Sequence, residues 1–535
     1  MRKLTWDQRR GLRWGAVAAS FALIAGLTAC GPATSADDAA GNDEPVAERG
    51  EELALQFRGA PISLDPALQG TASGSIFTVL AYDPIIYQAP DGSLQPSLAT
   101  EWDFVDDDYR QFEFTLREGL EFASGEPLDA EAVKASMEYF LGAGGGQIPR
   151  VGPISSIEAV DEQTVRISYE QPWADAAFSL TQTVMFGNVI GPDGLADPDS
   201  LLQVMDGAGQ YIYDAEASVP DSEYVYTLNP NYWNPDAQMW DRVTIEIITD
   251  PNAVLNAAST GQIDFGLGSP LFADAAEAAG LTVAAAPFYN WELRLHDVNG
   301  EVNPALADPR VREAIGLAID RESIVAALGG EYMSPSDQFV VEGLEGHNPD
   351  IGWEFDLDRA KDLMAEAGYE DGFTMSVLDS SVQDNQSQIA QAVASSLAEI
   401  GIDVNLVVDA VSIPSFSEKL ESGEYEASFW ASNGDVANSY RPFRSGGSMN
   451  NPFGVMDDEM EALYAESLTV GGEEREKIYQ QMSERWQEAA FSIPILTGYF
   501  VNYIGPKVTN VDSSAKNPVM LPVGPEPEYN WQPVQ

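Results

Sequence analysis

Residues 373–430 read FTMSVLDSSVQDNQSQIAQAVASSLAEIGIDVNLVVDAVSIPSFSEKLESGEYEASFW, and strand and helix patterns alternate along them. Phe373, Met375 and Val377 alternate with polar residues, which predicts a half-buried strand. Apolar residues at helical spacing follow and end at Gly401, residues 402–408 form a second strand pattern, and a third strand is expected over residues 425–430 after a short helix. This order favours a parallel sheet with right-handed crossovers, so the chain is predicted to be of the α/β class.

The same two patterns recur on both sides of this stretch. Leu53, Leu55 and Phe57 alternate with polar neighbours, as do residues 243–247, and both segments predict strands. Asp308 before a proline is typical of a helix start. Apolar residues on one face of this helix predict that it packs into the core, and its charged residues are expected to be solvated. A further helix is expected to end at Gly368.

Five basic residues and a short apolar segment precede the only cysteine, Cys30. The apolar segment, residues 14–27, is shorter than the ~20 residues that a membrane-spanning helix needs. The run Leu27-Thr28-Ala29-Cys30 has the pattern of bacterial lipoproteins, whose cysteine receives a diacylglycerol and becomes the new N-terminus. We therefore expect residues 1–29 to be a lipoprotein signal peptide and Cys30 to be lipidated. The alternative is a free buried cysteine, and Arg9-Arg10 leaves open whether export uses the Sec or the twin-arginine route.

Charge and composition limit the partners of the mature chain. Residues 30–50 are rich in acidic residues and proline and poor in apolar ones, which predicts a flexible tether. The full sequence has a net charge of −58, which repels phosphates, so nucleic acid is not an expected partner. The same charge disfavours adsorption to anionic lipids, so membrane attachment is expected to come from the acyl chains. With a single cysteine, no intramolecular disulfide is expected.

Eight short motifs follow one another after residue 51. They are LDPA (64–67), PSLATEW (96–102), FTLREGLEF (114–122), SGEPLDAEAV (124–133), GAGQY (207–211), NPNYW (229–233), DPRVR (308–312) and AIDR (318–321). In this order they resemble the large solute-binding proteins of ABC importers, the peptide and nickel class of family 5. Residues 117–119 and 229–231 are each typical of a turn, with Tyr232 and Trp233 packing beneath the second. The motifs therefore identify the scaffold and do not mark the ligand.

The resemblance implies a periplasmic-binding-protein-like fold of two lobes with a hinge plus an extra small domain. Lobe I is expected to be discontinuous and to comprise residues 51–70, 201–289 and 490–535. The small extra domain is expected over residues 71–200, and lobe II over residues 290–489. The lobes of such proteins close on the ligand, and the closed form docks on a membrane permease.

Enzymes and metal sites have little support in the sequence. Its two histidines are His296, expected to pack, and His347, expected in a solvated loop. No Gly-x-Ser-x-Gly elbow is present, the glycine-rich residues 142–146 lack the Lys-Ser/Thr of a phosphate loop, and no pair of cysteines or spaced histidines could hold zinc. No enzymatic activity, cofactor or metal is therefore expected. Two alternatives stay open, a secreted hydrolase with two carboxylates and a surface receptor or chaperone that does not transport.

The ligand site is expected beyond the carboxyl end of the predicted strand at residues 425–430, where ligands of parallel sheets bind. The candidates there are Trp430, Asn433, Asp435, Tyr440 and Arg441. In peptide binders of the family, an aspartate a few residues after the matching tryptophan receives the α-ammonium. Here the nearest position holds Asn433 and the first acid is Asp435, so either Asp435 takes this role or the ligand is not a simple free peptide.

Arg441 could hold a carboxylate by a two-pronged contact. Weaker candidates are Thr71 and Ser73, after the first strand, and Tyr289 and Asn290, near the expected hinge. The alternative is an ordinary polar loop with Trp430 in the core and Arg441 on the surface. The sequence thus predicts a lipid-anchored monomer outside the cytoplasmic membrane. It would capture a peptide or related small solute and deliver it to the permease and ATPase subunits of an ABC transporter.

Overall fold

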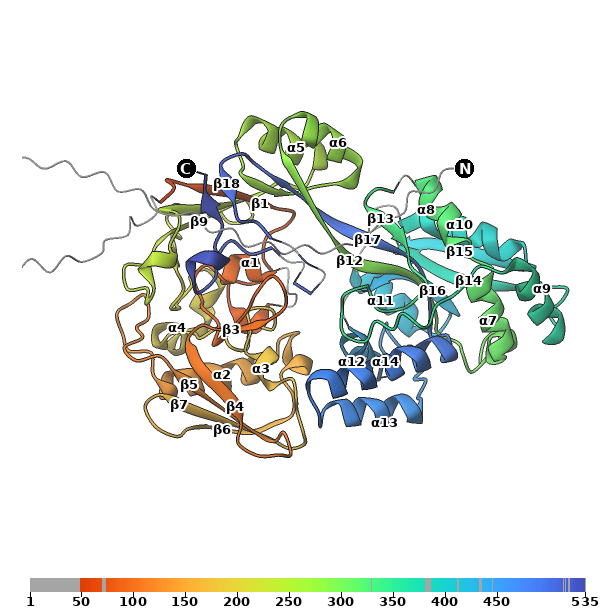
Figure 1. Cartoon of the computed structure of the whole chain (residues 1–535), viewed down its shortest axis with the longest axis horizontal. Helices are drawn as coiled ribbons and strands as arrows, with labels where there is room; N and C mark the ends of the chain where they lie inside the picture. Colours follow the sequence, from red (N-terminus) through yellow and green to blue (C-terminus); the bar gives the residue numbers. More distant parts are fainter. Residues whose placement is uncertain are drawn as a thin grey trace, which may run out of the picture. The chain divides into compact units, whose positions relative to one another are not determined.

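A computed structural model describes residues 49–535, apart from residues 70–73, 329, 381–385, 411–412, 433–434, 445, 513, 515, 518–519 and 535. The predicted signal peptide, Cys30 and most of the predicted tether lie outside the described residues. Thr71, Ser73 and Asn433 lie outside them too. Figure 1 shows the arrangement of the helices and strands.

Within the described residues, one mixed sheet has 11 strands. In spatial order they are β15 (Ile402–Ala410), β14 (Phe373–Ser380), β16 (Ala427–Ser432), β12 (Thr282–Leu295), β17 (Ser492–Ile504), β11 (Phe265–Leu267), β1 (Leu53–Phe57), β10 (Arg242–Ile247), β9 (Glu223–Leu228) and β8 (Tyr211–Tyr213), with β13 (Met333–Pro335) paired to β17. The strands predicted at residues 53–57 and 243–247 are confirmed as β1 and β10, which pair in parallel.

The helices lie between these strands in the chain. They are α1 (Ser75–Thr78), α2 (Ala130–Ala143), α3 (Ala176–Ser179), α4 (Pro192–Ala196), α5 (Pro251–Thr260), α6 (Ala273–Ala278), α7 (Pro309–Leu317), α8 (Arg321–Leu328), α9 (Leu357–Glu366), α10 (Gln386–Ala398), α11 (Ile413–Glu421), α12 (Val436–Arg444), α13 (Asp458–Ser467) and α14 (Gly472–Ala489). The alternation predicted over residues 373–430 is confirmed, because α10 and α11 connect β14, β15 and β16, and β14 pairs in parallel with both other strands.

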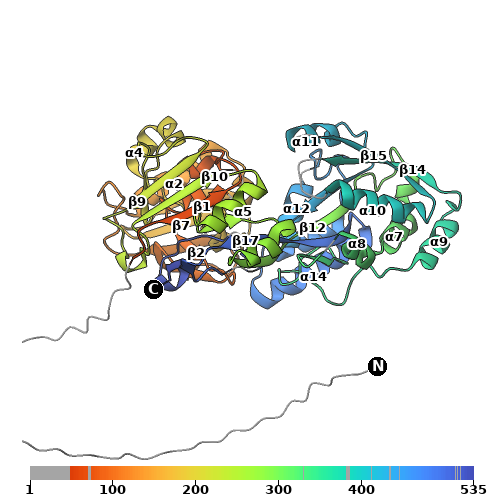
Figure 2. The same ribbon diagram turned by 90° about the horizontal axis from the view of Figure 1, so that it is seen from above.

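The two long strands β12 and β17 connect the two ends of the sheet. They pair antiparallel from Thr282 opposite Ile504 to Arg294 opposite Ser492. One end of this ladder continues through β11 into β1 and β10, and the other continues through β16 into β14 and β15. In Figures 1 and 2, β12 and β17 accordingly run side by side between the β1–β10 half and the β14–β15 half.

A smaller sheet of four antiparallel strands stands apart from the large one. Its order is β4 (Ala99–Phe104), β5 (Gln111–Leu116), β7 (Thr164–Tyr169) and β6 (Ile154–Ala159). The remaining pairs are the hairpin of β2 (Ile86–Gln88) with β3 (Leu94–Pro96) and the pair of β18 (Val508–Thr509) with β19 (Gln532–Pro533). The boundaries predicted for the two lobes and the small domain stay predictions.

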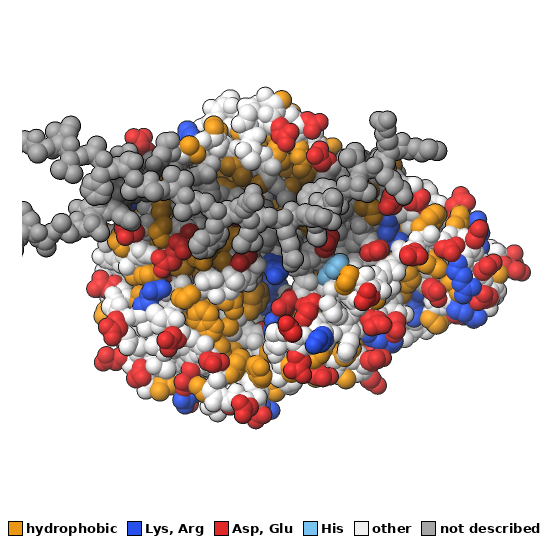
Figure 3. All heavy atoms as spheres, viewed as in Figure 1, with side chains coloured by type: hydrophobic (Ala, Val, Ile, Leu, Met, Phe, Trp, Pro, Cys, Tyr) orange, Lys and Arg blue, Asp and Glu red, His pale blue; other side chains and the backbone are white. Residues whose placement is uncertain are grey.

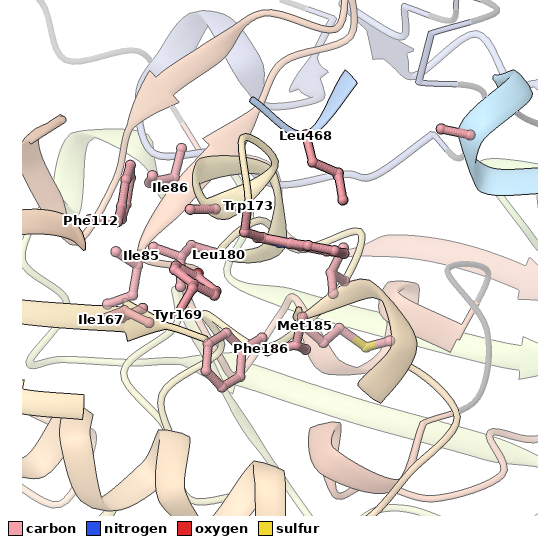
Figure 4. Close-up of a cluster of buried hydrophobic side chains, with 14 of the residues drawn as sticks. Ile85, Ile86, Phe112, Ile167, Tyr169, Trp173, Leu180, Met185, Phe186 and Leu468 are labelled. Atoms are coloured by element: carbon pink, nitrogen blue, oxygen red, sulfur yellow. The ribbon is translucent and has the colours of Figure 1, made fainter. Parts of the chain in front are cut away.

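The largest apolar cluster among the described residues brings together segments that are far apart in the sequence. One apolar cluster contains residues from positions 67–208 and also from positions 436–491. Figure 4 shows part of it, with Leu468 from the second segment next to Trp173 from the first. A backbone hydrogen bond from the Ala174 N–H to the Leu468 carbonyl, 3.2 Å long, ties the two segments at this point.

The local predictions for single motifs have mixed outcomes. Asp308 caps α7 as predicted, since its carboxylate accepts the N–H of Arg310 at 2.9 Å. The expectation that the charges of this helix are solvated is wrong for Arg312. That side chain is only 9% exposed. It donates to the carbonyls of Ala489 and Leu306, at 3.0 and 2.7 Å, which lie at the C-terminal ends of α14 and of a 3₁₀ turn, where carbonyl groups lack donors within the helix.

Candidate ligand-binding site

A cavity of about 400 Å³ lies among side chains from four separate stretches of the chain, residues 75–183, 288–345, 435–479 and 516–521. This volume is within the range of small-molecule sites. Its acidic lining residues are Asp175, Glu345 and Asp435, and its basic ones are Arg150, Arg441, Arg475 and Lys516. Acidic side chains are scattered over the face shown in Figure 3, and the chain has a net charge of −58. A cavity wall with four basic and three acidic residues is therefore a local exception.

Three polar residues follow one face at the start of α12. Asp435 precedes the helix, and its Oδ1 accepts the N–H of Asn438 at 2.7 Å in the manner of an N-cap. Its Oδ2 accepts Nδ2 of the same asparagine at 2.7 Å. Arg441 lies one turn further on and donates from Nη1 to Asn438 Oδ1 at 3.1 Å and from Nε to Tyr464 Oη at 3.0 Å. The helix thus orients Asp435 and Arg441 toward the same cavity.

Asp175 reaches this face from the segment that carries α3. It precedes α3, and its side chain makes no capping hydrogen bond there. Instead its carboxylate pairs with the Arg441 guanidinium and, through Oδ1, with Arg475 Nη1 at 2.9 Å. Burial is the largest influence on both arginines and opposes their charge, but the Asp175 carboxylate and the other acidic and tyrosine neighbours together outweigh it, so the pKa of each arginine is raised. Both arginines therefore stay charged, and acidic side chains of the protein balance their charge.

Glu345 completes this network at the cavity mouth. Its Oε2 lies 3.1 Å from Nη2 of Arg475, and its side chain is 49% exposed. Burial raises the pKa of Glu345, and the charge of Arg475 acts in the opposite direction. The network Arg441–Asp175–Arg475–Glu345 therefore contains two cations and two anions and leaves no surplus charge.

Arg150 differs from the other two arginines of the cavity. Within the described part of the chain its guanidinium has no hydrogen bond and no ion pair. Burial, and after it the positive charge of Arg441, lowers the pKa of Arg150, while Asp435 and Asp175 act in the opposite direction from beyond contact distance. Arg150 thus brings an uncompensated positive charge to the cavity wall.

Apolar side chains line the remainder of the wall, chiefly Leu94, Phe178, Phe288, Leu344 and Leu521. Phe288 owes its position to a β-bulge. In the ladder of β12 with β17, Pro287 is opposite Tyr499 and Tyr289 is opposite Gly498, so Phe288 is the extra residue without a partner. A bulge re-aims a side chain, and here the ring of Phe288 lies against the cavity.

The predicted site residues have different surroundings. Asp435 and Arg441 line the cavity. Trp430 stacks on Phe416, with ring centroids 4.9 Å apart, and lies with a separate apolar cluster. Tyr440 is 1% exposed, and its hydroxyl donates to Glu461 at 2.8 Å. Neither of these two aromatic residues lines the cavity.

The two candidates on β12 are also absent from the cavity lining. Asn290 is fully buried, donates to the carbonyls of Gln338 and Phe339, and accepts the Thr497 hydroxyl. Tyr289 packs over Gly498, where an added Cβ would lie 2.5 Å from the ring. Thr71, Ser73 and Asn433 lie outside the described residues. Binding by any of the nine residues stays a prediction.

Sequence reasoning missed Arg150, Asp175, Arg475 and Phe288. Arg150 had one available signal, since it closely follows the glycine-rich residues 142–146 in a chain with few basic residues. Asp175 is one of 85 acidic residues and Arg475 lies on an ordinary polar helix, so nothing local distinguished them. A bulge at Phe288 has no signature in its own strand, because it depends on the register of β17.

The histidines do not contribute to the cavity. His296 is 4% exposed, and its Nε2 lies 2.8 Å from Ser428 Oγ. Burial lowers the pKa of His296 to about 3, so its ring is neutral, and the prediction that it packs is confirmed. His347 is half-buried, not fully solvated as predicted. Among the described residues, no group of three or more His, Cys, Asp or Glu side chains could hold a metal ion. None of the helices in the described ranges is long and apolar enough to cross a membrane.

The fold and the cavity place the chain in a known class. A family model described as bacterial extracellular solute-binding proteins, family 5 Middle, matches residues 93–452. This is more than half of the chain, which therefore belongs to that family, the solute-binding proteins of ABC importers for peptides and related solutes. The resemblance noted in the motifs is thus confirmed.

Individual relatives are distant in sequence. Heme-binding protein A of Haemophilus influenzae is 24% identical over 537 residues, which cover 90% of this chain and 93% of the relative. Di/tripeptide-binding protein 2 of Pseudomonas aeruginosa is 26% identical over 401 residues, which cover 66% of this chain and 71% of that protein. The solved structure of HbpA2 from Haemophilus parasuis matches 87% of this chain and 98% of its own with a TM-score of 0.76 and 22% identity. This likeness confirms the predicted α/β fold of periplasmic-binding-protein type.

Proposed function

We propose that this protein is a lipid-anchored solute receptor that encloses a short peptide, or a solute of similar size and charge, in the 400 Å³ cavity and presents it to an ABC permease. The observation that carries the proposal is the pairing of Asp175 with Arg441 and Arg475 across the cavity. These ion pairs join segments that are 266 and 300 residues apart, and the cavity lies between those segments. The pairs therefore act as a closing contact.

The strands β12 and β17 are proposed as the hinge of this motion. They provide the continuous backbone link between the two halves of the large sheet. The ladder between them is interrupted at Pro287/Tyr289 and at Trp291/Glu292. Bulges disrupt ladder hydrogen bonds locally, so they are the positions at which a paired ribbon bends with least loss. Closure about them would bring Asp175 toward Arg441.

A short peptide is supported by the charges of the cavity and by its size. Asp435 keeps acceptor sites beyond its two bonds to Asn438, because an ionised carboxylate offers about four. It is proposed to receive the ammonium group of the ligand. The apolar residues Phe288 and Phe178 would contact side chains. One relative is named as a di/tripeptide-binding protein, which agrees in ligand size.

Attachment, partners and lack of turnover complete the proposal. Cys30 is proposed to carry the lipid that holds the protein at the outer side of the cytoplasmic membrane. The protein is proposed to act as a monomer, with the permease and ATPase subunits as partners. It would bind the solute without altering it chemically, which a turnover assay with the bound solute can check.

A thermal-shift screen tests the ligand class. The probes are mixed-sequence dipeptide and tripeptide pools, chelated nickel and oligosaccharides. A ligand at 100 times its dissociation constant stabilises by about 2.7 kcal/mol, which gives a clear increase in Tm. The peptide pools are expected to raise Tm and the oligosaccharides to leave it unchanged. A response to oligosaccharides alone would refute the proposed ligand class.

A further inference from the structure

A buried ion pair on β12 lies outside the cavity. Glu292 and Arg294 are two positions apart, so they share one face of this strand, while residues 291, 293 and 295 face an apolar cluster on the other side. Nε of Arg294 lies 2.8 Å from Oε1 of Glu292, and the two side chains are 15% and 0% exposed. Removing two charges from water is costly, and an apolar pair of similar volume is often at least as stable. Stability alone therefore does not explain this pair.

The hydrogen bonds of the pair extend to two other segments. Oε1 of Glu292 accepts from Arg294 and from the Ser432 hydroxyl, whereas its buried Oε2 has no hydrogen-bond partner among the described residues. The guanidinium of Arg294 donates from Nη2 to Ser432 Oγ and from Nη1 to Asn450 Oδ1, the latter at 2.7 Å. The pair thus joins the end of β16 to the segment around Asn450.

Ser432 and Asn450 lie on either side of α12 in the chain. Ser432 is the last residue of β16, and Asp435, which caps the start of α12, follows closely. Beyond the helix, Asn451 is the neighbour of Asn450, and its Nδ2 donates to the carbonyl of Phe443 at 3.0 Å, in the last turn of α12. The buried pair is therefore connected to both ends of this helix.

The helix α12 has little stability of its own. It has nine residues and includes Pro442, which lacks the N–H of a helical hydrogen bond. Isolated helices of this length are marginal in water. Ser439 of the helix lines a small void together with Arg294, so α12 lies over the face of β12 that carries the pair. The positions of Asp435 and Arg441 at the cavity wall consequently depend on how α12 is held.

We infer that Glu292 and Arg294 are positioning residues for the ligand site, which hold α12 at both ends and thereby fix Asp435 and Arg441. The inference rests on the proposed function, because it takes the cavity as the ligand site. Neither residue of the pair lines the cavity, so each acts through its contacts at the ends of α12. A site that is already ordered loses less freedom when the ligand binds. The pair should therefore raise affinity without raising stability.

The test uses two variants that separate position from stability. Glu292→Met/Arg294→Met replaces the ion pair by apolar side chains of similar length, and Asn450→Ala releases one end of α12 while the ion pair stays intact. The measurements are the Tm without ligand, amide hydrogen exchange followed by mass spectrometry, and calorimetry. Calorimetry uses the tripeptide that gives the wild type its largest thermal shift in a screen of mixed-sequence tripeptides.

The double variant should melt at or above the Tm of the wild type. Its α12 amides should nevertheless exchange faster, while the amides of α2 keep their wild-type rates. Its affinity for the tripeptide should fall by roughly 2- to 30-fold, the range for residues that act without contact with the ligand. Asn450→Ala should show smaller changes in the same direction.

Glu113→Met/Arg166→Met is the matched control, since it removes an ion pair between residues that face each other on β5 and β7 and do not line the cavity. It should leave the exchange of α12 and the affinity unchanged. Wild-type exchange and affinity in Glu292→Met/Arg294→Met would overturn the inference and leave the cavity as the ligand site. A lower Tm with faster exchange in α2 as well would show a general structural role and would overturn it too.

Two further outcomes are also decisive. If Glu292→Met/Arg294→Met does not fold, unchanged exchange of α12 in Asn450→Ala overturns the inference. If the wild type responds to no tripeptide, the peptide ligand of the proposed function is refuted. The exchange rates of α12 then decide the positioning role by themselves, because they are measured without ligand.

Discussion

The carboxylate of Asp175 is ion-paired with the guanidinium of Arg441, although 266 positions separate the two residues in the chain. Their side chains are 12% and 9% exposed, so the pair is largely shielded from water. The same carboxylate binds Arg475, and the Arg441 guanidinium also lies 5.2 Å from the ring centroid of Trp173. Breaking one partner of a buried pair typically costs about 3–5 kcal/mol, because the remaining charge stays buried. A contact of this strength would favour the closed form that we propose.

Asp175→Asn should open the unliganded protein. The substitution removes the carboxylate that Arg441 and Arg475 share, and separation of the two segments lets water solvate the two guanidinium groups. Small-angle scattering should show a larger radius of gyration for the variant than for the wild type. Glu113→Gln is the control, because Glu113 pairs with Arg166 inside the four-stranded sheet and should leave the dimensions unchanged. Equal radii for Asp175→Asn and wild type would argue against the closing contact.

Phe288→Ala should weaken ligand binding more than Phe500→Ala does. The two rings are in contact, with centroids 4.9 Å apart, and lie on the neighbouring strands β12 and β17. Truncation of either ring removes similar packing. Phe288 lines the cavity and Phe500 does not, so only the truncation of Phe288 also removes contact with the ligand. Burial of an aromatic side chain contributes about 1.5–3 kcal/mol, which corresponds to roughly a 10- to 100-fold change in affinity. Calorimetry with the peptide selected by the screen measures both variants, and equal losses would contradict the role of the bulge.

Asp83→Asn should change how stability depends on pH. Asp83 accepts hydrogen bonds from Tyr232 Oη at 2.9 Å and Trp233 Nε1 at 3.0 Å. These are the two aromatic residues that the sequence predicts to pack beneath the turn at 229–231. Burial raises its pKa from 3.8 to about 7. The folded state thus holds the proton more tightly than the unfolded state. The contribution of Asp83 is therefore fully present below about pH 4 and is lost as pH rises to about pH 7.

Urea denaturation at several pH values between about pH 4 and pH 8 checks this sign. The free energy of unfolding of the wild type should fall relative to Asp83→Asn as pH increases, with a slope of at most about 1.4 kcal/mol per pH unit. Above about pH 7 the difference should level off. Parallel curves for the two proteins would show that Asp83 is already ionised when folded.

Cys30→Ala should release the protein from the membrane. Cys30 is the only cysteine and follows the lipoprotein pattern at residues 27–29, so no other thiol could replace it. Fractionation of cells should move the variant from the membrane fraction to the soluble fraction outside the cytoplasmic membrane. Intact-mass measurement of the wild type should show loss of residues 1–29 and addition of a diacylglycerol. An unmodified Cys30 or a retained leader would refute the anchor.

The sequence by itself determined the elements whose signals are local. Alternating and helical spacing of apolar residues over 373–430 predicted three parallel strands and two helices, and Asp308 before Pro309 predicted the start of α7. These features depend on neighbours within a few positions, so composition and spacing are sufficient. The rule that ligands lie beyond the carboxyl ends of parallel strands also led to Asp435 and Arg441, which line the cavity.

Only the tertiary structure decided which charges meet and which do not. Asp175 pairs with Arg441 and Arg475 over 266 and 300 positions, and Arg150 is left without a partner among the described residues. Arg312 is buried against the carbonyl of Ala489, 177 positions away, although its own helix is capped and amphipathic. Phe288 faces the cavity because the register of β17 forces a bulge. Coulomb energy and packing depend on distance in space, and in a chain with 85 acidic residues the local sequence does not specify which of them an arginine will reach.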